Sequence, residues 1–319
     1  MSQSSGPASR MERHQVAVYL GALAAGALLG RLAPAAGPGL EPAINPILAA
    51  LLYVTFLQVP AAELGRSLRD ARFLGAALAV NFVVVPLVVA AMFAFFPAGP
   101  ALRLGMLLVL LAPCVDYVIV FSGLAGGSSR RLLAATPVLL LAQMILLPGF
   151  LYLFLGADLA RVVRVGPFLR AFLVLIVVPL VLAWLTQAWA ARYASGRRFA
   201  DAGGSAMVPL MAVALATVVA SQAPKVHGVG VVAVVPVYVV FLVVMAFAGL
   251  GVVRLFRLDV SGGRAIVFTG AARNSLVVLP VVLALPGEFA VAAVGVVAQT
   301  LVEVVGMVCY VRWVPRLLS

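Results

Sequence analysis

The chain has 319 residues, of which 65% are hydrophobic and 10% charged, and its mean hydropathy is +1.19. Soluble domains are nearer to about half apolar and about a quarter charged, so lipid must solvate most of this chain. The net charge of +12 does not indicate a nucleic-acid-binding protein, because the basic residues occur in twos and threes between apolar runs rather than as one patch.

Ten apolar segments follow one another along the chain, and each is long enough to cross a bilayer, which needs about 20 residues. Short turns containing Gly, Pro, Arg or Ser separate them. The segments cover residues 14–33, 42–61, 73–96, 101–124, 132–155, 168–190, 204–222, 228–250, 264–285 and 288–311. The sequence therefore predicts an all-α membrane protein of ten transmembrane helices.

The first segment has an alternative interpretation. Arg10 and Arg13 precede an apolar run that ends at Ala33-Pro34-Ala35, which is also the pattern of a secretory signal peptide. We favour a transmembrane helix, because nine remaining segments would not divide into two equal sets.

The basic residues predict the orientation of the helices. Cytoplasmic loops are enriched in Lys and Arg, and the segment ends that include both termini carry most of them, so both termini are predicted to be cytoplasmic. The richer set is Arg10, Arg13, Arg66, Arg69, Arg72, Arg130, Arg131, Arg192, Arg197, Arg198, Arg254, Arg257, Arg264, Arg312 and Arg316. The poorer set is Arg31, Arg103, Arg161, Arg164, Arg170 and Lys225.

A connecting loop at 156–167 divides the ten segments into five and five. Because five is odd, two homologous halves inserted in succession would have opposite orientations, which is the inverted-repeat plan of many secondary transporters. The predicted organisation is a cytoplasmic tail, two five-helix repeats joined by the loop, and a second cytoplasmic tail. Their bounds are 1–13, 14–155, 156–167, 168–311 and 312–319.

The fourth segment of each half is interrupted near its middle, at Ala112-Pro113-Cys114-Val115-Asp116 and at 269–275, which reads Thr-Gly-Ala-Ala-Arg-Asn-Ser. Paired interruptions of this kind are a sequence indication of a transport site at mid-membrane depth. Each interruption also carries a charged residue. We therefore expect the transport site to lie at these two interruptions, near the bilayer midplane.

Asp116, Arg273 and Glu303 are the ionisable residues in the middle third of the segments. Each costs about 2.5–3.5 kcal/mol at the bilayer centre if it faces lipid, so we expect all three to face the protein interior and one another. Their sum is one negative charge, which one bound proton would neutralise. Glu303 or Asp116 is thus predicted to carry a coupling proton, with Arg273 as partner. The alternative is a buried ion triad that only clamps three helices.

Several polar neighbours could complete the site. Gln299 lies one turn before Glu303 on the same helix face, as a coupling residue or as an interhelical hydrogen bond. Asn274 and Ser275 could coordinate a ligand or satisfy freed backbone groups. Cys114 is either a small packed side chain or, as a thiolate, a soft ligand. Asn81 is expected to hydrogen-bond between helices.

No metal ion or cofactor is expected. The two histidines, His14 and His227, have no Cys or His neighbour at the spacing of metal ligands. The segments also contain no Ser/His pair, His/Glu metal motif or nucleotide-binding loop, so an enzyme is disfavoured. A membrane sensor or scaffold is disfavoured as well, because the tails are too short for a signalling domain.

At these motifs the chain resembles the bile acid/arsenite/riboflavin transporter superfamily, and within it the bacterial arsenite-efflux permeases. The residues that carry the resemblance are Cys114, Thr269-Gly270-Ala271 with Asn274, and Leu301-Val302-Glu303-Val304. The resemblance implies two inverted five-helix repeats arranged as a panel and a core. It also implies a multi-pass protein of the bacterial inner membrane, with helices four and nine crossing at the site.

The chain departs from these relatives at the site. The sodium-coupled branch has a Glu where this chain has Thr269 and a Gln where it has Arg273, and a fixed guanidinium would repel Na⁺. Sodium coupling is therefore disfavoured. Arg273 also differs from the Asn of typical arsenite permeases, and Asp116 replaces a small residue.

Two functions remain open. The first is a proton-coupled antiporter that exports arsenite and confers arsenical resistance, with Cys114 contacting arsenic and Glu303 in coupling. The second is a carrier, not coupled to sodium, of a small organic or oxygenated anion bound by Arg273. Both act in a lipid bilayer on a small solute, and the oligomeric state stays open.

Overall fold

The computed structural model describes residues 15–57, 70–95, 99–115, 117–156, 173–222, 229–275, 278–279, 282 and 290–318. Within these ranges all regular elements are helices, so the all-α prediction is confirmed there. The chain divides into two compact units that alternate along the sequence. Unit 1 contains Met1–Pro60 and Gly166–Gly228, and unit 2 contains Ala61–Val165 and Val229–Ser319.

Unit 1 is a group of four long helices, in which α13 packs against both α2 and α3 and α12 packs against α3 and α13. The helices are α2 (Gln15–Leu32), α3 (Gly37–Leu57), α12 (Val178–Arg192) and α13 (Ala194–Gln222), with a short 3-10 turn η1 (Pro34–Ala36) and a π-helical turn η3 (Leu173–Val177). Gly26 allows α2 and α13 to touch, because a Cβ there would lie 2.6 Å from the carbonyl oxygen of Ala216.

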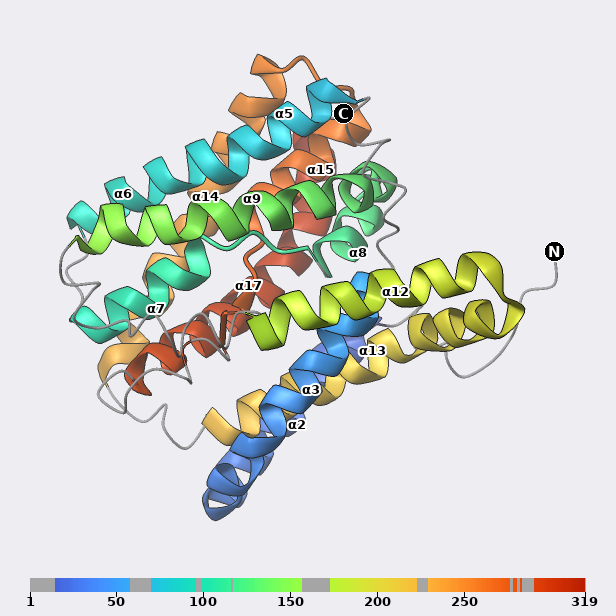
Figure 1. Ribbon diagram of the computed structural model, residues 1–319. Coiled ribbons are helices and arrows are strands. Elements are labelled where there is room, and N and C mark those ends of the chain that lie inside the picture. The colour runs from blue at the N-terminus through green and yellow to red at the C-terminus, as the bar shows by residue number, and fades with distance from the viewer. Residues whose placement is uncertain are drawn as a thin grey trace. The chain divides into compact units, whose positions relative to one another are not determined.

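Unit 2 is built around a buried short helix, α15, in which every residue from Ala265 to Ala271 is buried. It packs most extensively against α14, and α14 and α7 both pack against α17 (Figure 1). The helices are α5 (Ala71–Ala79), η2 (Val80–Val84, π-helical), α6 (Val85–Phe95), α7 (Pro100–Leu110), α8 (Tyr117–Leu124), α9 (Ser129–Leu155), α14 (Val229–Leu255), α15 (Val260–Ala271) and α17 (Ala290–Leu317).

Each of the ten predicted segments overlaps at least one of these helices. Among the described residues, four helices are long and apolar enough to cross a membrane, and two bent helix pairs raise that number to six. The others are shorter: α7 has 11 residues, about 16 Å of helix, against about 30 Å of hydrocarbon. The total of ten crossings and the opposite orientation of the halves stay predictions.

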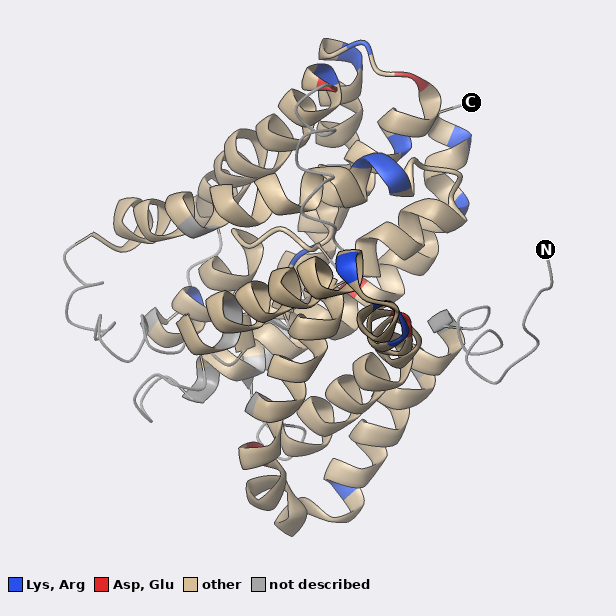
Figure 2. Cartoon of the chain, turned by 45° about the vertical axis from the view of Figure 1, so that its right-hand side comes forward, with Lys and Arg blue, Asp and Glu red and all other residues tan. Residues whose placement is uncertain are grey.

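The compact units do not coincide with the predicted halves of the sequence. Unit 1 takes the first two segments of each half, and unit 2 takes the last three of each half. Most of the helical length in both units carries no charged side chain, as expected for surfaces that face lipid or protein (Figure 2). Both interrupted helices therefore belong to unit 2.

Gly105 allows α7 and α17 to approach closely. A Cβ at this position would lie 2.5 Å from the carbonyl oxygen of Ala292, so we expect Gly105→Ala to push the helices apart and lower the free energy of unfolding by about 1–3 kcal/mol. Thermal unfolding of the detergent-solubilised protein measures the change. Gly149→Ala on α9 is the matched control, because no atom lies within 4 Å of its Cβ position. Equal losses for the two variants would contradict the assignment.

Candidate functional site

The two predicted interruptions are real breaks, and they lie against each other in unit 2. Helix α7 ends at Leu110 and α8 begins at Tyr117, while α15 ends at Ala271. The non-helical residues that follow α7 and those that follow α15 pair in antiparallel fashion, through an isolated bridge between Pro113 and Arg273. This pairing satisfies backbone groups that the ends of the helices leave without partners.

Two backbone hydrogen bonds hold the breaks together. The Cys114 N–H donates to the carbonyl oxygen of Ala272 over 3.2 Å, and the Asn274 N–H donates to that of Ala112 over 2.8 Å. The second break starts later than predicted, because residues 269–271 still belong to α15. The carbonyl groups of these residues are nevertheless at the end of α15 and can accept hydrogen bonds from donors outside the helix.

Arg273 supplies those donors. Its fully buried guanidinium donates to the carbonyl oxygens of Thr269 and Gly270 over 2.7 Å each and to that of Leu110 over 3.3 Å. A fourth bond, of 2.8 Å, goes to Oδ1 of Asn81. The last carbonyl groups of a helix lack intrahelical partners and carry partial negative charge. Arg273 therefore caps the carboxyl ends of α7 and α15 together.

Asn81 belongs to the π-helical turn η2, a type of distortion that is frequent at functional sites. Besides accepting from Arg273, its side-chain amide donates to the carbonyl oxygen of Ala77 over 3.0 Å and to Oγ1 of Thr269 over 3.3 Å. The predicted interhelical role of Asn81 is confirmed. Its amide thereby links η2 to both Arg273 and Thr269.

Glu303 on α17 is 1% exposed and accepts hydrogen bonds from three donors. The Tyr117 hydroxyl donates over 2.5 Å, the Arg273 backbone N–H donates over 2.8 Å, and the Gln299 side-chain amide also donates. Gln299 thus lies on the same helix face as Glu303, as predicted. The carboxylate connects α17 to the start of α8 and to the second break.

Arg273 and Glu303 are both buried and in contact, but the contact is through the backbone N–H of Arg273 and not through its guanidinium. In the part of the chain that the structure describes, these two side chains form no ion pair within 4.0 Å. The guanidinium turns to carbonyl oxygens, and the carboxylate instead contacts the backbone of Arg273. Asp116, predicted as a substrate and coupling residue, lies outside the described residues.

The other predicted residues surround this arrangement. Cys114 is 1% exposed in the first break, and Asn274 and Ser275 are equally buried in the second. Within the described ranges, the Ser275 hydroxyl and Oε1 of Gln299 have no hydrogen-bond partner. Buried polar atoms without partners are uncommon in native proteins and are satisfied by water or a ligand. These two atoms are available to a small polar solute.

Sequence reasoning missed Tyr117. Its hydroxyl donates to Glu303 and lies 3.3 Å from the carbonyl oxygen of Arg273, so it touches both key residues. A tyrosine directly after an interrupted helix was the available signal. Across the described ranges, no three His, Cys, Asp or Glu residues lie close enough to hold a metal ion.

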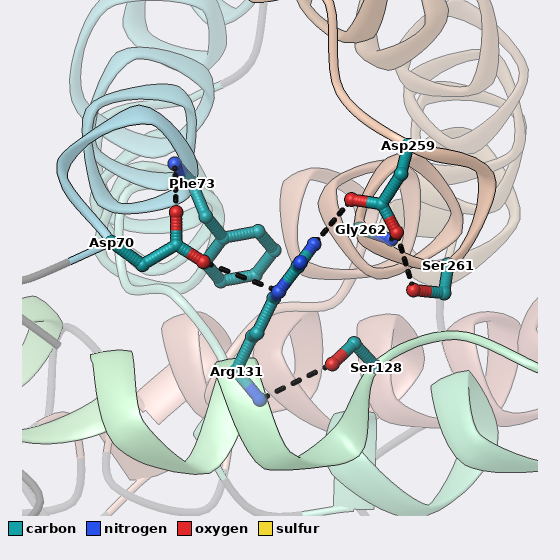
Figure 3. Close-up of polar contacts among 7 residues, drawn as sticks. All are labelled: Asp70, Phe73, Ser128, Arg131, Asp259, Ser261 and Gly262. Atoms are coloured by element: carbon teal, nitrogen blue, oxygen red, sulfur yellow. Dashed lines mark hydrogen bonds and ion pairs between the residues drawn. The ribbon is translucent and has the colours of Figure 1, made fainter. Parts of the chain in front are cut away.

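A second polar cluster lies where α5, α9 and α15 begin (Figure 3). Arg131 bridges two carboxylates, Asp70 over 3.2 Å and Asp259. Each carboxylate is also the amino-terminal cap of its own helix, as is Ser128 for α9. Arg131 thereby fastens three helix starts, including that of α15, which leads to the second break.

Asp259 gives this cluster a pH dependence. Hydrogen bonds from Ser261 and Arg131 lower the pKa of Asp259 from 3.8 to about 2. A depressed pKa means that the stabilisation is complete above pH about 4 and is lost as the pH falls towards 2. We expect a loss of at most about 1 kcal/mol, because the pair is solvent-exposed. Unfolding of the protein and of Asp259→Asn at pH 5 and pH 3 measures it. An identical pH response of both proteins would contradict the prediction.

Comparison with known protein families finds a match. The model of the Sodium Bile acid symporter family matches residues 45–227, more than half of the chain. The match includes α7, α8 and the first break, and it ends before α15 and α17. No curated protein matches the chain.

Proposed function

The chain belongs to the sodium bile acid symporter family, a family of membrane transporters, and from this premise we propose that it is a proton-coupled antiporter. The proposed solute is arsenous acid, exported through a site at the paired breaks. Glu303 carries the proton, and Cys114 contacts arsenic.

The observation that carries this proposal is the position of Glu303. The carboxylate accepts from Tyr117, from the Arg273 backbone and from Gln299, and so touches both sides of the paired breaks. A protonated carboxyl becomes a donor and loses part of its capacity to accept. Proton binding therefore changes the contacts that join α17 to both interrupted helices.

The surroundings of Arg273 support a proton rather than sodium as the coupling ion. Four oxygen atoms point at the guanidinium, from Leu110, Thr269, Gly270 and Asn81. Oxygen atoms of carbonyl and amide groups are also the ligands of hard metal cations. Here the guanidinium of Arg273 occupies the space between these oxygen atoms, and its positive charge repels a sodium ion.

The same contacts favour a neutral solute over the alternative, a small organic or oxygenated anion bound by Arg273. An anion would have to reach a completely buried guanidinium whose Nη1 and Nη2 groups already donate four hydrogen bonds, which leaves only Nε–H to bind it without displacing one of them. Arsenous acid needs no counter-ion. A cysteine in the break offers a soft ligand of the kind that a thiophilic solute prefers, and Ser275 and Gln299 offer unpaired polar atoms.

Cys114→Ser tests the solute. We expect this variant to abolish arsenite resistance in an arsenite-sensitive host, because oxygen is a poor ligand for a thiophilic element. Cys309→Ser, at the exposed cysteine of α17, is the matched control and should retain resistance. Full resistance with Cys114→Ser would refute arsenite as the solute bound at this break. Transport of an organic anion by both variants would instead establish the alternative.

A further inference from the structure

Unit 2 has an apolar groove between α14 and α17 that the proposed transport mechanism does not use. Its volume is about 860 Å³, and its lining includes Val243 and Phe247 of α14 and Val305, Trp313 and Arg316 of α17. Phe247, Val305 and Trp313 are each more than half exposed. Among the described residues of unit 2, none covers these large apolar side chains.

The groove is long enough to hold a lipid chain. On α17 its lining extends from Leu301 to Leu317, about 24 Å at about 1.5 Å per residue. One leaflet of a bilayer with about 30 Å of hydrocarbon is about 15 Å deep. An acyl chain can therefore lie in the groove over the whole depth of its leaflet.

One end of the groove is positively charged. Both helices end on the same side of unit 2, because a Cβ on Gly263 would touch Val253 of α14 and Leu318, which follows α17. Their last turns carry Arg254 and Arg316, both exposed. In the described parts of α14 and α17 the acidic residue is Glu303, which is buried, so the two arginines have no acidic neighbour on these helices.

We propose that this groove binds an anionic phospholipid, with an acyl chain along α14 and α17 and the phosphate at Arg316 and Arg254. Trp313 lies near the same end, where an indole ring suits the boundary between headgroups and hydrocarbon. Basic sites between transmembrane helices bind acidic headgroups in the same way. The side chains that line the groove are different from those placed at the transport site, so the proposal is independent of the proposed function.

The fluorescence of Trp313 tests the proposal in the full chain carrying Trp184→Phe and Trp189→Phe. The protein is reconstituted with brominated phosphatidylglycerol or brominated phosphatidylcholine at equal, low mole fractions, because bromine quenches tryptophan on contact. We expect about fivefold more quenching per mole from the anionic lipid, which corresponds to about 1 kcal/mol.

Arg316→Gln should reduce the ratio of quenching by the anionic lipid to quenching by the neutral lipid towards one. Arg254→Gln provides a second variant at the same end. Arg192→Gln on α12 is the matched control and should leave the ratio unchanged. Equal quenching by both lipids in the parent would overturn the proposal, because the groove then contacts bulk lipid only. Absence of quenching by either lipid, with cross-linking of Cys309 between two copies, would also overturn it and assign the groove to a second chain.

Discussion

Replacing Arg273 with Ala is expected to lower the free energy of unfolding by about 3–5 kcal/mol. The guanidinium donates to three backbone carbonyl groups and to Asn81. Its removal leaves these buried acceptors without partners, each at a cost of about 1–3 kcal/mol before relaxation. Thermal or denaturant unfolding in detergent measures the loss. Arg192→Ala, at an exposed position of α12, is the control and should change stability by no more than about 0.5 kcal/mol.

The same variant tests whether Arg273 acts as an attached cation. Arg273→Ala exposes a group of oxygen atoms that a small cation can enter, so NaCl should raise its unfolding temperature more than choline chloride does at equal ionic strength. The parent protein should show no such difference. Equal effects of both salts on Arg273→Ala would show that the oxygen atoms do not form a cation site when the guanidinium is removed.

Glu303→Gln is expected to abolish proton coupling while preserving the shape of the site. One pH unit corresponds to about 1.36 kcal/mol, so one-for-one exchange of proton and solute supports about a tenfold solute gradient per unit. The amide of Gln cannot carry the proton. The ratio of solute concentrations across the membrane should therefore stay near one for the Glu303→Gln protein at every imposed pH difference. The steady-state solute ratio across sealed proteoliposomes measures this, and solute–solute exchange should persist.

Tyr117→Phe is the matched control for that experiment. It removes one of the three donors to Glu303 but leaves the carboxylate in place, so the gradient per pH unit should be retained at a reduced rate. A Glu303→Gln protein with the gradient of the parent would remove Glu303 from coupling.

The broken helices were predictable because helix interruption depends on local sequence. Hydropathy located the helices, and a proline or glycine three residues before a charge indicated breaks at 112–116 and 269–275, although the second break begins only after Ala271. The hydrogen-bond partners of the Arg273 guanidinium were not predictable from the number and sign of the charges. A charge count pairs opposite charges, whereas the structure shows that the unsatisfied carbonyl groups of two helix ends compete successfully for the guanidinium.

Residues far apart in sequence explain the other differences. Tyr117 and Glu303 are 186 positions apart, and nothing in either segment alone indicates their contact. Arg131 likewise meets Asp70 and Asp259 because three helices begin at one end of unit 2. The division into units 1 and 2 also depends on pairing between the two sequence halves, which hydropathy does not specify.

Accessibility of Cys114 tests the central claim, that the solute binds where the two broken helices meet. A Cys309→Ala protein retains Cys114 as its one cysteine, and a membrane-impermeant thiol reagent then reports on the break in proteoliposomes. We expect Cys114 to be labelled during turnover and saturating arsenite to slow labelling at least about tenfold. Labelling at a rate that arsenite does not change, or no labelling during active transport, would contradict it.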